Sequence, residues 1–210
     1  MLIYGSSLSP FVRKTMAFAT EKGVAFENRV NPPGHDDPEF MACSPFKKIP
    51  GFQDGDFRIS DSTAIITYLD ALHPEPNLIP LEPRARARTI WFEEYADTIF
   101  VAAAGKIFFN RIVGPRFMGL ASDEATVEKA ITIEMPPVLD YLERTIPDSG
   151  FLIEDRLTLA DLAVASPFAN LDHAGFDFAK WPRARAYADA ILARPAFAGP
   201  IAKEKRLLGG

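Results

Sequence analysis

Three serine hydroxyls stand just before the first predicted helix, where they could act on a bound anion. Ser6, Ser7 and Ser9 follow a short apolar stretch and precede Pro10. Ser9 occupies the position of a helix N-cap, and Pro10 suits the first helical position because proline has no amide proton to leave unpaired. The free amides of a first helical turn attract anions. A hydroxyl beside them would stabilise an anion docked at this turn.

Two cations, Arg13 and Lys14, follow in the same turn. Cations have the wrong sign for the positive end of a helix dipole, so the folding of this helix does not require them there. A docked anion would account for both. Ser9 also has an alternative interpretation as a plain N-cap, which contributes about 1 kcal/mol to helix stability. The residues alone leave both interpretations open.

The first 73 residues must position these groups, and they alternate between strand and helix signals. Hydrophobic periodicity, glycine and proline punctuation and an Asp-Gly-Asp hairpin turn define the elements. Their order predicts a small mixed sheet covered by helices. The predicted elements are strand 2–4, helix 10–22, strand 25–30, a loop at 31–38, a short helical piece at 39–42, strands 51–53 and 57–59, and helix 61–72.

Beyond a proline-rich linker the sequence predicts helix throughout. Pro136 and Pro137 should kink or break the second long helix. Thr158 and Asp161 have the spacing of a capping box, so we expect Asp161 to stabilise a helix rather than to act on a ligand. The predicted helices cover residues 84–109, 124–144, 158–171 and 183–193, with a short piece after residue 195.

Length and composition narrow the class of protein. A chain of 210 residues, 48% hydrophobic and 24% charged, is typical of a globular protein with one large or two small domains. Its net charge of -5 offers no basic field to nucleic acid. No apolar stretch approaches the roughly 20 residues of a membrane span, and residues 1–30 carry no leader pattern. We divide the chain into a domain at 1–74, a linker at 75–82 and a helical domain at 83–210.

Cysteine and histidine usage argues against a metal site. The single Cys43 excludes an internal disulfide and a thiolate metal site, and it is typical of a protein from the reducing cytoplasm. His35, His73 and His173 are dispersed and lack the spacing of metal ligands. We therefore expect no metal, no nucleic acid and no membrane among the partners, and a cytoplasmic location.

Several short motifs together resemble the glutathione S-transferase family, of the cytosolic type with a serine-containing active-site loop. They are Ser-Pro-Phe at 9–11, Lys-Ile-Pro at 48–50, the helix start at 61–66, the capping box at 158–161 and Arg-Pro-Ala-Phe at 194–197. They occur in the family's order and cover essentially the whole chain. The resemblance implies an α/β thioredoxin-like N-terminal domain with a mixed four-stranded sheet, an all-α C-terminal domain, a homodimer, and glutathione as cofactor.

The resemblance implies a role for Ser9 that helix capping does not. Its hydroxyl would donate a hydrogen bond to the glutathione sulfur and favour the thiolate. Lowering a thiol pKa from near 8.5 by ~2 units requires about 2.7 kcal/mol. A hydrogen bond to a charged acceptor supplies ~1.5–3 kcal/mol and the helix dipole adds ~0.3–1 kcal/mol, so no metal or general base is needed. Ser7 and Ser6 remain alternatives for the same role.

The Lys-Ile-Pro motif resembles the corner at which the family holds the backbone of glutathione. Ile49 and Pro50 would form its cis-proline bond, and Ile49 would offer its backbone N–H and C=O to the cysteinyl residue as a short added strand does. Lys48 would contact the glycine carboxylate. Lys47 stands where the family often has glycine, so either lysine could make that contact. A solvated loop cation is the alternative interpretation.

Asp61 and Ser62 begin a helix after the hairpin, and helix capping accounts for both residue types. The resemblance implies more specific roles. The first amides of the helix and the Ser62 hydroxyl would hold the γ-glutamyl carboxylate, while Asp61 would meet the γ-glutamyl ammonium group.

The resulting functional hypothesis is an enzyme that ionises glutathione and conjugates its sulfur to a small hydrophobic electrophile. We expect the electrophile's pocket near Phe11 and the long helix at 84–109. Relatives with an active-site serine also include glutathione-dependent isomerases, dehalogenases and ether-cleaving enzymes, which are alternatives. A non-catalytic ligand carrier is a further alternative from another class. Disulfide reduction is less expected because residues 5–9 contain no cysteine.

Overall fold

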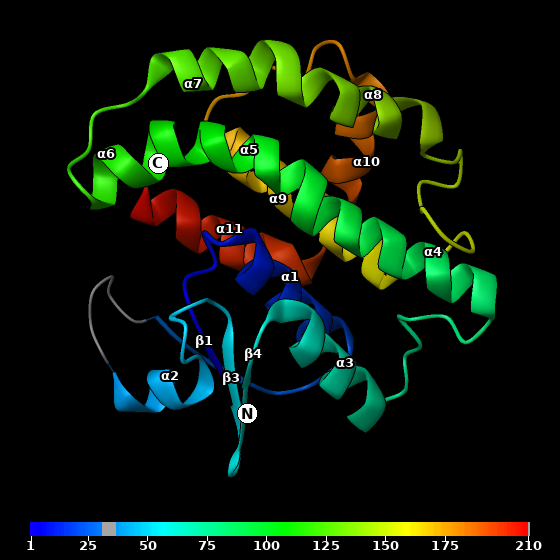
Figure 1. Ribbon diagram of the computed structural model, residues 1–210. Helices are drawn as coiled ribbons and strands as arrows, with labels where there is room; N and C mark the ends of the chain where they lie inside the picture. Colours follow the sequence, from blue (N-terminus) through cyan, green and yellow to red (C-terminus); the bar gives the residue numbers. More distant parts are fainter. Residues whose placement is uncertain (31–36, 210) are drawn as a thin grey trace. The chain divides into compact units, whose positions relative to one another are not determined.

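The computed structural model describes residues 1–30 and 37–209, and its contacts divide the chain into two compact units (Figure 1). The first unit comprises Met1–Ile79 together with Pro195–Gly210, and the second comprises Pro80–Arg194. These boundaries differ from the predicted ones because the C-terminal segment belongs to the first unit. The predicted loop at 31–38 lies mostly outside the described residues, as does His35.

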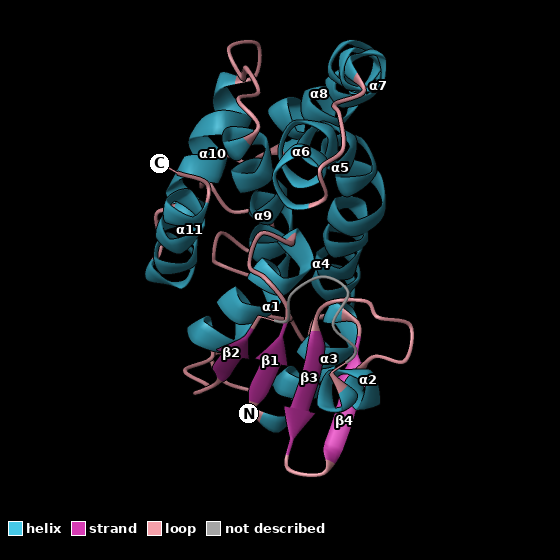
Figure 2. Ribbon diagram, turned by 90° about the vertical axis from the view of Figure 1, so that its left-hand side faces the viewer, coloured by secondary structure: helices cyan, strands magenta, loops and turns pink. Residues whose placement is uncertain are grey.

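The first unit contains the predicted mixed four-stranded sheet (Figure 2). Its strand order is β2-β1-β3-β4, with β1 parallel to β2 and antiparallel to β3, and β3 antiparallel to β4. The predicted hairpin at the Asp-Gly-Asp turn is therefore confirmed. The strands are β1 (Leu2–Tyr4), β2 (Glu27–Arg29), β3 (Gly51–Asp54) and β4 (Phe57–Ser60).

Helices cover this sheet and bury its apolar side chains. Ile3 and Phe52 of the sheet, and Phe18 and Ile65 of the helices, are fully buried. The helices of the first unit are α1 (Pro10–Glu21), α2 (Pro38–Cys43), α3 (Ser62–Leu72) and α11 (Pro195–Leu207). Sequence patterns predicted the first three, whereas α11 is longer than the short piece expected there. It packs against α1, and this contact places it in the first unit.

Within the described residues the regular secondary structure of the second unit is helical, apart from one isolated β-bridge between Ile153 and Arg156. The predicted all-α character of this region is confirmed. Three segments are π-helical and interrupt longer α-helical runs. The elements are α4 (Pro83–Glu94), η1 (Tyr95–Phe100), α5 (Val101–Phe108), η2 (Phe109–Val113), α6 (Gly114–Phe117), α7 (Glu124–Lys129), η3 (Ala130–Glu134), α8 (Met135–Thr145), α9 (Leu159–His173) and α10 (Pro182–Leu192).

Pro136 and Pro137 do not break the helical run, contrary to one expected outcome. Helical structure continues from α7 through η3 into α8, which begins at Met135. The amide of Met135 bonds to the carbonyl of Ala130, a π-type hydrogen bond. The two prolines thus occupy the first positions of α8, where their missing amide protons cost little. The interruption takes the form of a change in helix type.

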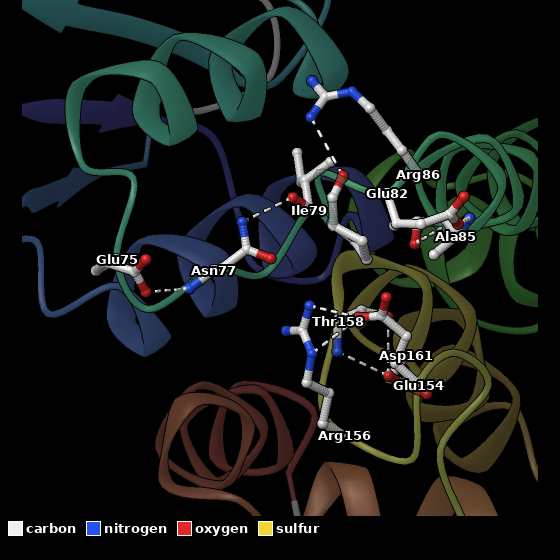
Figure 3. Close-up of polar contacts among 12 residues, drawn as sticks. Glu75, Asn77, Ile79, Glu82, Ala85, Arg86, Glu154, Arg156, Thr158 and Asp161 are labelled. Atoms are coloured by element: carbon white, nitrogen blue, oxygen red, sulfur yellow. Dashed lines mark hydrogen bonds and ion pairs between the residues drawn. The ribbon is translucent and has the colours of Figure 1, made fainter.

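The capping box before α9 is present and explains Asp161. Its carboxylate accepts the amide of Thr158 at 2.8 Å, as Figure 3 shows. It also accepts the amide of Leu152 at 2.9 Å and the hydroxyl of Tyr187 at 3.1 Å. Burial raises the pKa of this carboxyl, and these hydrogen bonds lower it. The expectation that Asp161 stabilises the fold is confirmed.

Candidate functional site

The sheet register brings three of the five predicted motifs to one edge. Tyr4 of β1 lies opposite Gly51 of β3, which lies opposite Ser60 of β4. Neighbouring strands are about 4.8 Å apart, so this row spans about 10 Å. The serine loop at 5–9 follows Tyr4, the Lys-Ile-Pro segment at 48–50 precedes Gly51, and the start of α3 follows Ser60. All three therefore leave the sheet at the same edge, which we call the candidate site edge (Figure 2).

Gly5 allows two of these segments to touch. Its φ is +129°, a conformation that residues with a Cβ rarely adopt. A Cβ built there would lie 2.7 Å from a Val12 methyl carbon and 2.9 Å from the Ile49 Cβ. The serine loop thus passes directly against Ile49. This role of Gly5 was not predicted from the sequence, although a glycine directly after a strand is a visible signal.

The three serines differ in what their hydroxyls contact. Ser9 is the N-cap of α1, but its Oγ accepts the Val12 amide at 3.5 Å, the long limit of a hydrogen bond. Ser6 Oγ accepts the amide of Leu8 at 3.3 Å. The Ser7 hydroxyl makes no hydrogen bond to any residue that the structure describes. Neither Ser6 nor Ser9 uses its hydroxyl proton in these contacts, and all three side chains are partly exposed. Each hydroxyl can therefore donate its proton to a ligand.

Arg13 does not require a docked anion. Its side chain is fully buried, and its guanidinium donates to Glu204 of α11 at 3.1 and 2.8 Å. The expectation that nothing in the fold calls for a cation here is therefore wrong for Arg13. The fold supplies a carboxylate from a residue 191 positions away, which no local pattern could indicate.

The segment before Ile49 is a tight turn held by Ser44. The Ser44 hydroxyl donates to the Lys48 carbonyl at 2.7 Å, and the Lys47 amide donates to the Ser44 carbonyl at 2.9 Å. Lys47 has φ +56°, the left-handed region that glycine adopts at no cost. This conformation explains why glycine suits the position. The Lys48 side chain is exposed and has no partner among the residues that the structure describes.

Ile49 presents an unpaired backbone edge. The Ile49–Pro50 peptide bond is cis, as the family resemblance implied, and Ile49 is 38% exposed. Its backbone N–H and C=O make no hydrogen bond to another described residue. An extended peptide laid beside Ile49 could therefore pair with both groups, as an added strand does.

Asp61 and Ser62 combine a strained backbone with an unpaired hydroxyl. Asp61 has φ +84° and ψ +128°, and such conformations of residues other than glycine cost about 1–3 kcal/mol. One oxygen of its carboxylate caps α3 by accepting the Ala64 amide at 3.1 Å. Ser62 is only 3% exposed, and its hydroxyl has no partner among the described residues. Capping explains the first contact but neither the strain nor the unpaired hydroxyl.

The remaining candidates offer no competing chemistry. Cys43 is buried, and burial raises the pKa of its thiol, which makes it a poor nucleophile. Phe11 lies in the first turn of α1 and is half-buried. Within residues 1–30 and 37–209, no three His, Cys, Asp or Glu side chains are grouped as a metal site would need. No helix in those ranges is long and apolar enough to cross a membrane.

Comparison with known proteins finds the same family over both units. The family model described as "Glutathione S-transferase, N-terminal domain" matches residues 3–77, and "Glutathione S-transferase, C-terminal domain" matches residues 124–190. Glutathione S-transferase 3 of Zea mays is 32% identical over 209 residues, covering 95% of this chain and 92% of the relative. A glutathione S-transferase of Hyoscyamus muticus is 30% identical over 209 residues, covering 96% and 97%.

A solved structure shows the same fold. The crystal structure of a glutathione S-transferase from Rhodospirillum rubrum F11 superposes with a TM-score of 0.86, covering 95% of this chain and 90% of that one. Its sequence identity is 24%. The arrangement of sheet and helices is therefore the same in these two proteins, although their sequence identity is low.

Proposed function

This chain belongs to the glutathione S-transferase family, and on that premise we propose that it ionises the thiol of glutathione and conjugates the sulfur to a small hydrophobic electrophile. One observation carries the proposal. The candidate site edge gathers, within about 10 Å, a serine loop, an unpaired backbone segment and a strained helix start with an unpaired hydroxyl. An extended tripeptide has a similar length, about 10 Å.

The proposed binding mode assigns one part of glutathione to each segment. The Ser62 hydroxyl and the first amides of α3 hold the γ-glutamyl carboxylate, and Asp61 meets its ammonium group. The backbone of Ile49 pairs with the cysteinyl residue. Lys48 or Lys47 contacts the glycine carboxylate. Family membership supports a cytoplasmic location and a role in detoxification.

The proposed chemistry needs only a hydroxyl and a helix terminus. Ser9 donates its O–H to the glutathione sulfur, and the thiol proton leaves to solvent. The sulfur then forms a bond to the electrophilic carbon of the second substrate, which loses a leaving group or gains a proton. Isomerase, dehalogenase and ether-cleaving activities would use the same thiolate. A pure ligand carrier would have no use for the thiol-activating loop.

A pH titration of bound glutathione tests this function. The ultraviolet absorbance of the thiolate should report an apparent pKa about 1–2 units below the ordinary value near 8.5. A panel of electrophiles should then reveal conjugation. Binding without a lowered thiol pKa would support the carrier, and failure to bind glutathione would reject the proposal outright.

We also propose a homodimer, supported by the exposure of Phe46. This side chain is 85% exposed in the turn before Lys47. A phenylalanine so exposed is a candidate anchor for a pocket on a second copy, where its burial contributes about 1.5–3 kcal/mol. Phe46→Ser should therefore raise the dimer dissociation constant by about 10-fold or more, measured by sedimentation.

Leu207→Ser is the matched control for this prediction. Leu207 is also exposed, at 60%, but lies at the end of α11. Its replacement should leave the dissociation constant unchanged. A wild-type protein that sediments as a monomer at micromolar concentration would disprove the homodimer.

A further inference from the structure

A buried ion pair joins the first turns of α1 to the C-terminal helix. Arg13 Nε donates to Glu204 Oε1 at 3.1 Å and Nη2 donates to Oε2 at 2.8 Å. Both residues are almost completely buried, at 0% and 2% exposure. Figure 1 shows α11 beside α1, and both helices belong to the first unit.

Stability alone does not account for this pair. Removing two charges from water is costly, and apolar side chains of similar volume are often as stabilising as a buried ion pair. The property that apolar groups lack is direction. Two parallel hydrogen bonds between a guanidinium and a carboxylate fix the orientation of both groups. The pair therefore suits a place where the exact position of a helix matters.

That place is the N-terminus of α1, next to Ser9. The Arg13 amide donates to the Ser9 carbonyl at 2.9 Å, so the two residues share one helical turn. The side-chain cap of Ser9 is weak, because its Oγ lies 3.5 Å from the Val12 amide. The side-chain cap therefore holds the Ser9 hydroxyl only loosely. Arg13, anchored to Glu204, restrains the same turn from its buried side.

We propose that Arg13 and Glu204 are positioning residues, which hold the first turn of α1 so that the Ser9 hydroxyl points at the bound thiol. The inference rests on the proposed function and extends it. It makes a residue near the C-terminus part of the thiol-activating apparatus of the first unit. Glutathione itself is held by other segments, so its affinity should depend little on this pair.

A charge-neutral double variant tests the role. Arg13→Met with Glu204→Met removes one cation and one anion, so the net charge near Ser9 is unchanged. We expect the thiol pKa of bound glutathione to rise by about 0.5–1 unit and kcat to fall about 3- to 10-fold. The dissociation constant of glutathione, from calorimetry, should change less than about 3-fold.

The matched control is an ion pair at the opposite, C-terminal end of α1. Lys22 Nζ lies 2.6 Å from Asp70 Oδ1, and Lys22 is the C-cap of the helix, about 20 Å from Ser9 by helical rise. Lys22→Met with Asp70→Leu should lower the melting temperature but leave the thiol pKa and kcat unchanged. Equal effects of the two double variants on thiol pKa would overturn the positioning role.

A single variant keeps the test decisive if the first double variant does not fold. Arg13→Lys retains the buried charge but cannot donate two parallel hydrogen bonds. It should shift thiol pKa and kcat in the same direction, by less, and no shift would overturn the inference. A wild-type protein with an ordinary thiol pKa would overturn both this inference and the proposed function. A lowered wild-type pKa that the Arg13 variants leave unchanged would overturn only the inference.

Discussion

Replacing Ser9 by glycine should lower kcat about 10- to 100-fold and raise the pKa of the bound glutathione thiol towards its free value. The physical reason is the loss of one hydrogen bond to a charged acceptor, which contributes ~1.5–3 kcal/mol. Each tenfold change in rate corresponds to about 1.4 kcal/mol of activation free energy. The affinity for glutathione should change little, because Ser62, Asp61 and Ile49 hold the rest of the peptide. Steady-state kinetics and thiolate absorbance measure both effects.

Glycine is the informative replacement because Ser9 is also an N-cap. Glycine caps a helix within a few tenths of a kcal/mol of serine, whereas alanine loses about 1 kcal/mol. Ser9→Ala should therefore lower both kcat and the melting temperature, and Ser9→Gly mainly kcat. Because the contact between Ser9 Oγ and the Val12 amide is long, 3.5 Å, we expect the stability loss of Ser9→Ala at the low end of the range for N-caps.

Ser6→Gly serves as the control within the same loop. Its hydroxyl accepts the Leu8 amide at 3.3 Å and is partly exposed, like that of Ser9. The Ser6→Gly variant should have a kcat and a thiol pKa of bound glutathione near the wild-type values. If Ser9→Gly keeps full activity and an unchanged thiol pKa, capping is the whole role of Ser9, and Ser6 and Ser7 become the candidates for thiol activation.

Local signals predicted the elements that form the candidate site edge. Ser9 and Pro10 mark the start of α1, the Asp-Gly-Asp turn marks the hairpin, and Asp61 marks the start of α3. Each signal acts within a few residues, so a single sequence contains it. The order of these elements was enough to predict a mixed sheet, and their convergence follows from its register.

Long-range pairing and unusual backbone conformations could not be predicted. Glu204 reaches Arg13 across 191 positions, and only the packing of α11 on α1 brings them together. The positive φ angles of Lys47 and Asp61 run against the intrinsic preference of both residue types. Tertiary contacts override local preference at such positions, and strained residues concentrate at functional sites.

Asp61→Asn combined with Ser62→Ala should weaken glutathione binding by at least about 100-fold. Hydrogen bonds to charged groups contribute about 1.5–3 kcal/mol each. The variant loses one such bond to the γ-glutamyl ammonium group and one to its carboxylate, so the binding free energy should weaken by about 3 kcal/mol or more. Asparagine caps a helix as well as aspartate does, so the variant should retain its fold. Calorimetry with glutathione measures the loss, and near wild-type affinity would contradict the proposed binding mode.

Asp123→Ala is the matched control for loss of a cap. Asp123 caps α7 by accepting the Thr126 amide at 3.1 Å, the same distance as between Asp61 and the Ala64 amide. Its replacement should lower the melting temperature and leave glutathione binding unchanged. A parallel loss of binding in this variant would show that capping and stability, rather than recognition, explain the effect at Asp61.

Asp61→Gly separates recognition from folding more sharply, because only recognition of the ligand by Asp61 predicts a loss of glutathione binding without a loss of stability. Asp61 has φ +84°, a conformation that strains a residue other than glycine by about 1–3 kcal/mol. Glycine relieves this strain, but it loses more conformational entropy on folding, which costs roughly 0.5–1 kcal/mol. The melting temperature should therefore stay the same or rise while glutathione affinity falls about 10-fold or more. If Asp61 only capped the helix, glycine would be the better residue there and binding would be unaffected. A variant that is both more stable and deficient in binding would show that the strained aspartate is kept for its ligand.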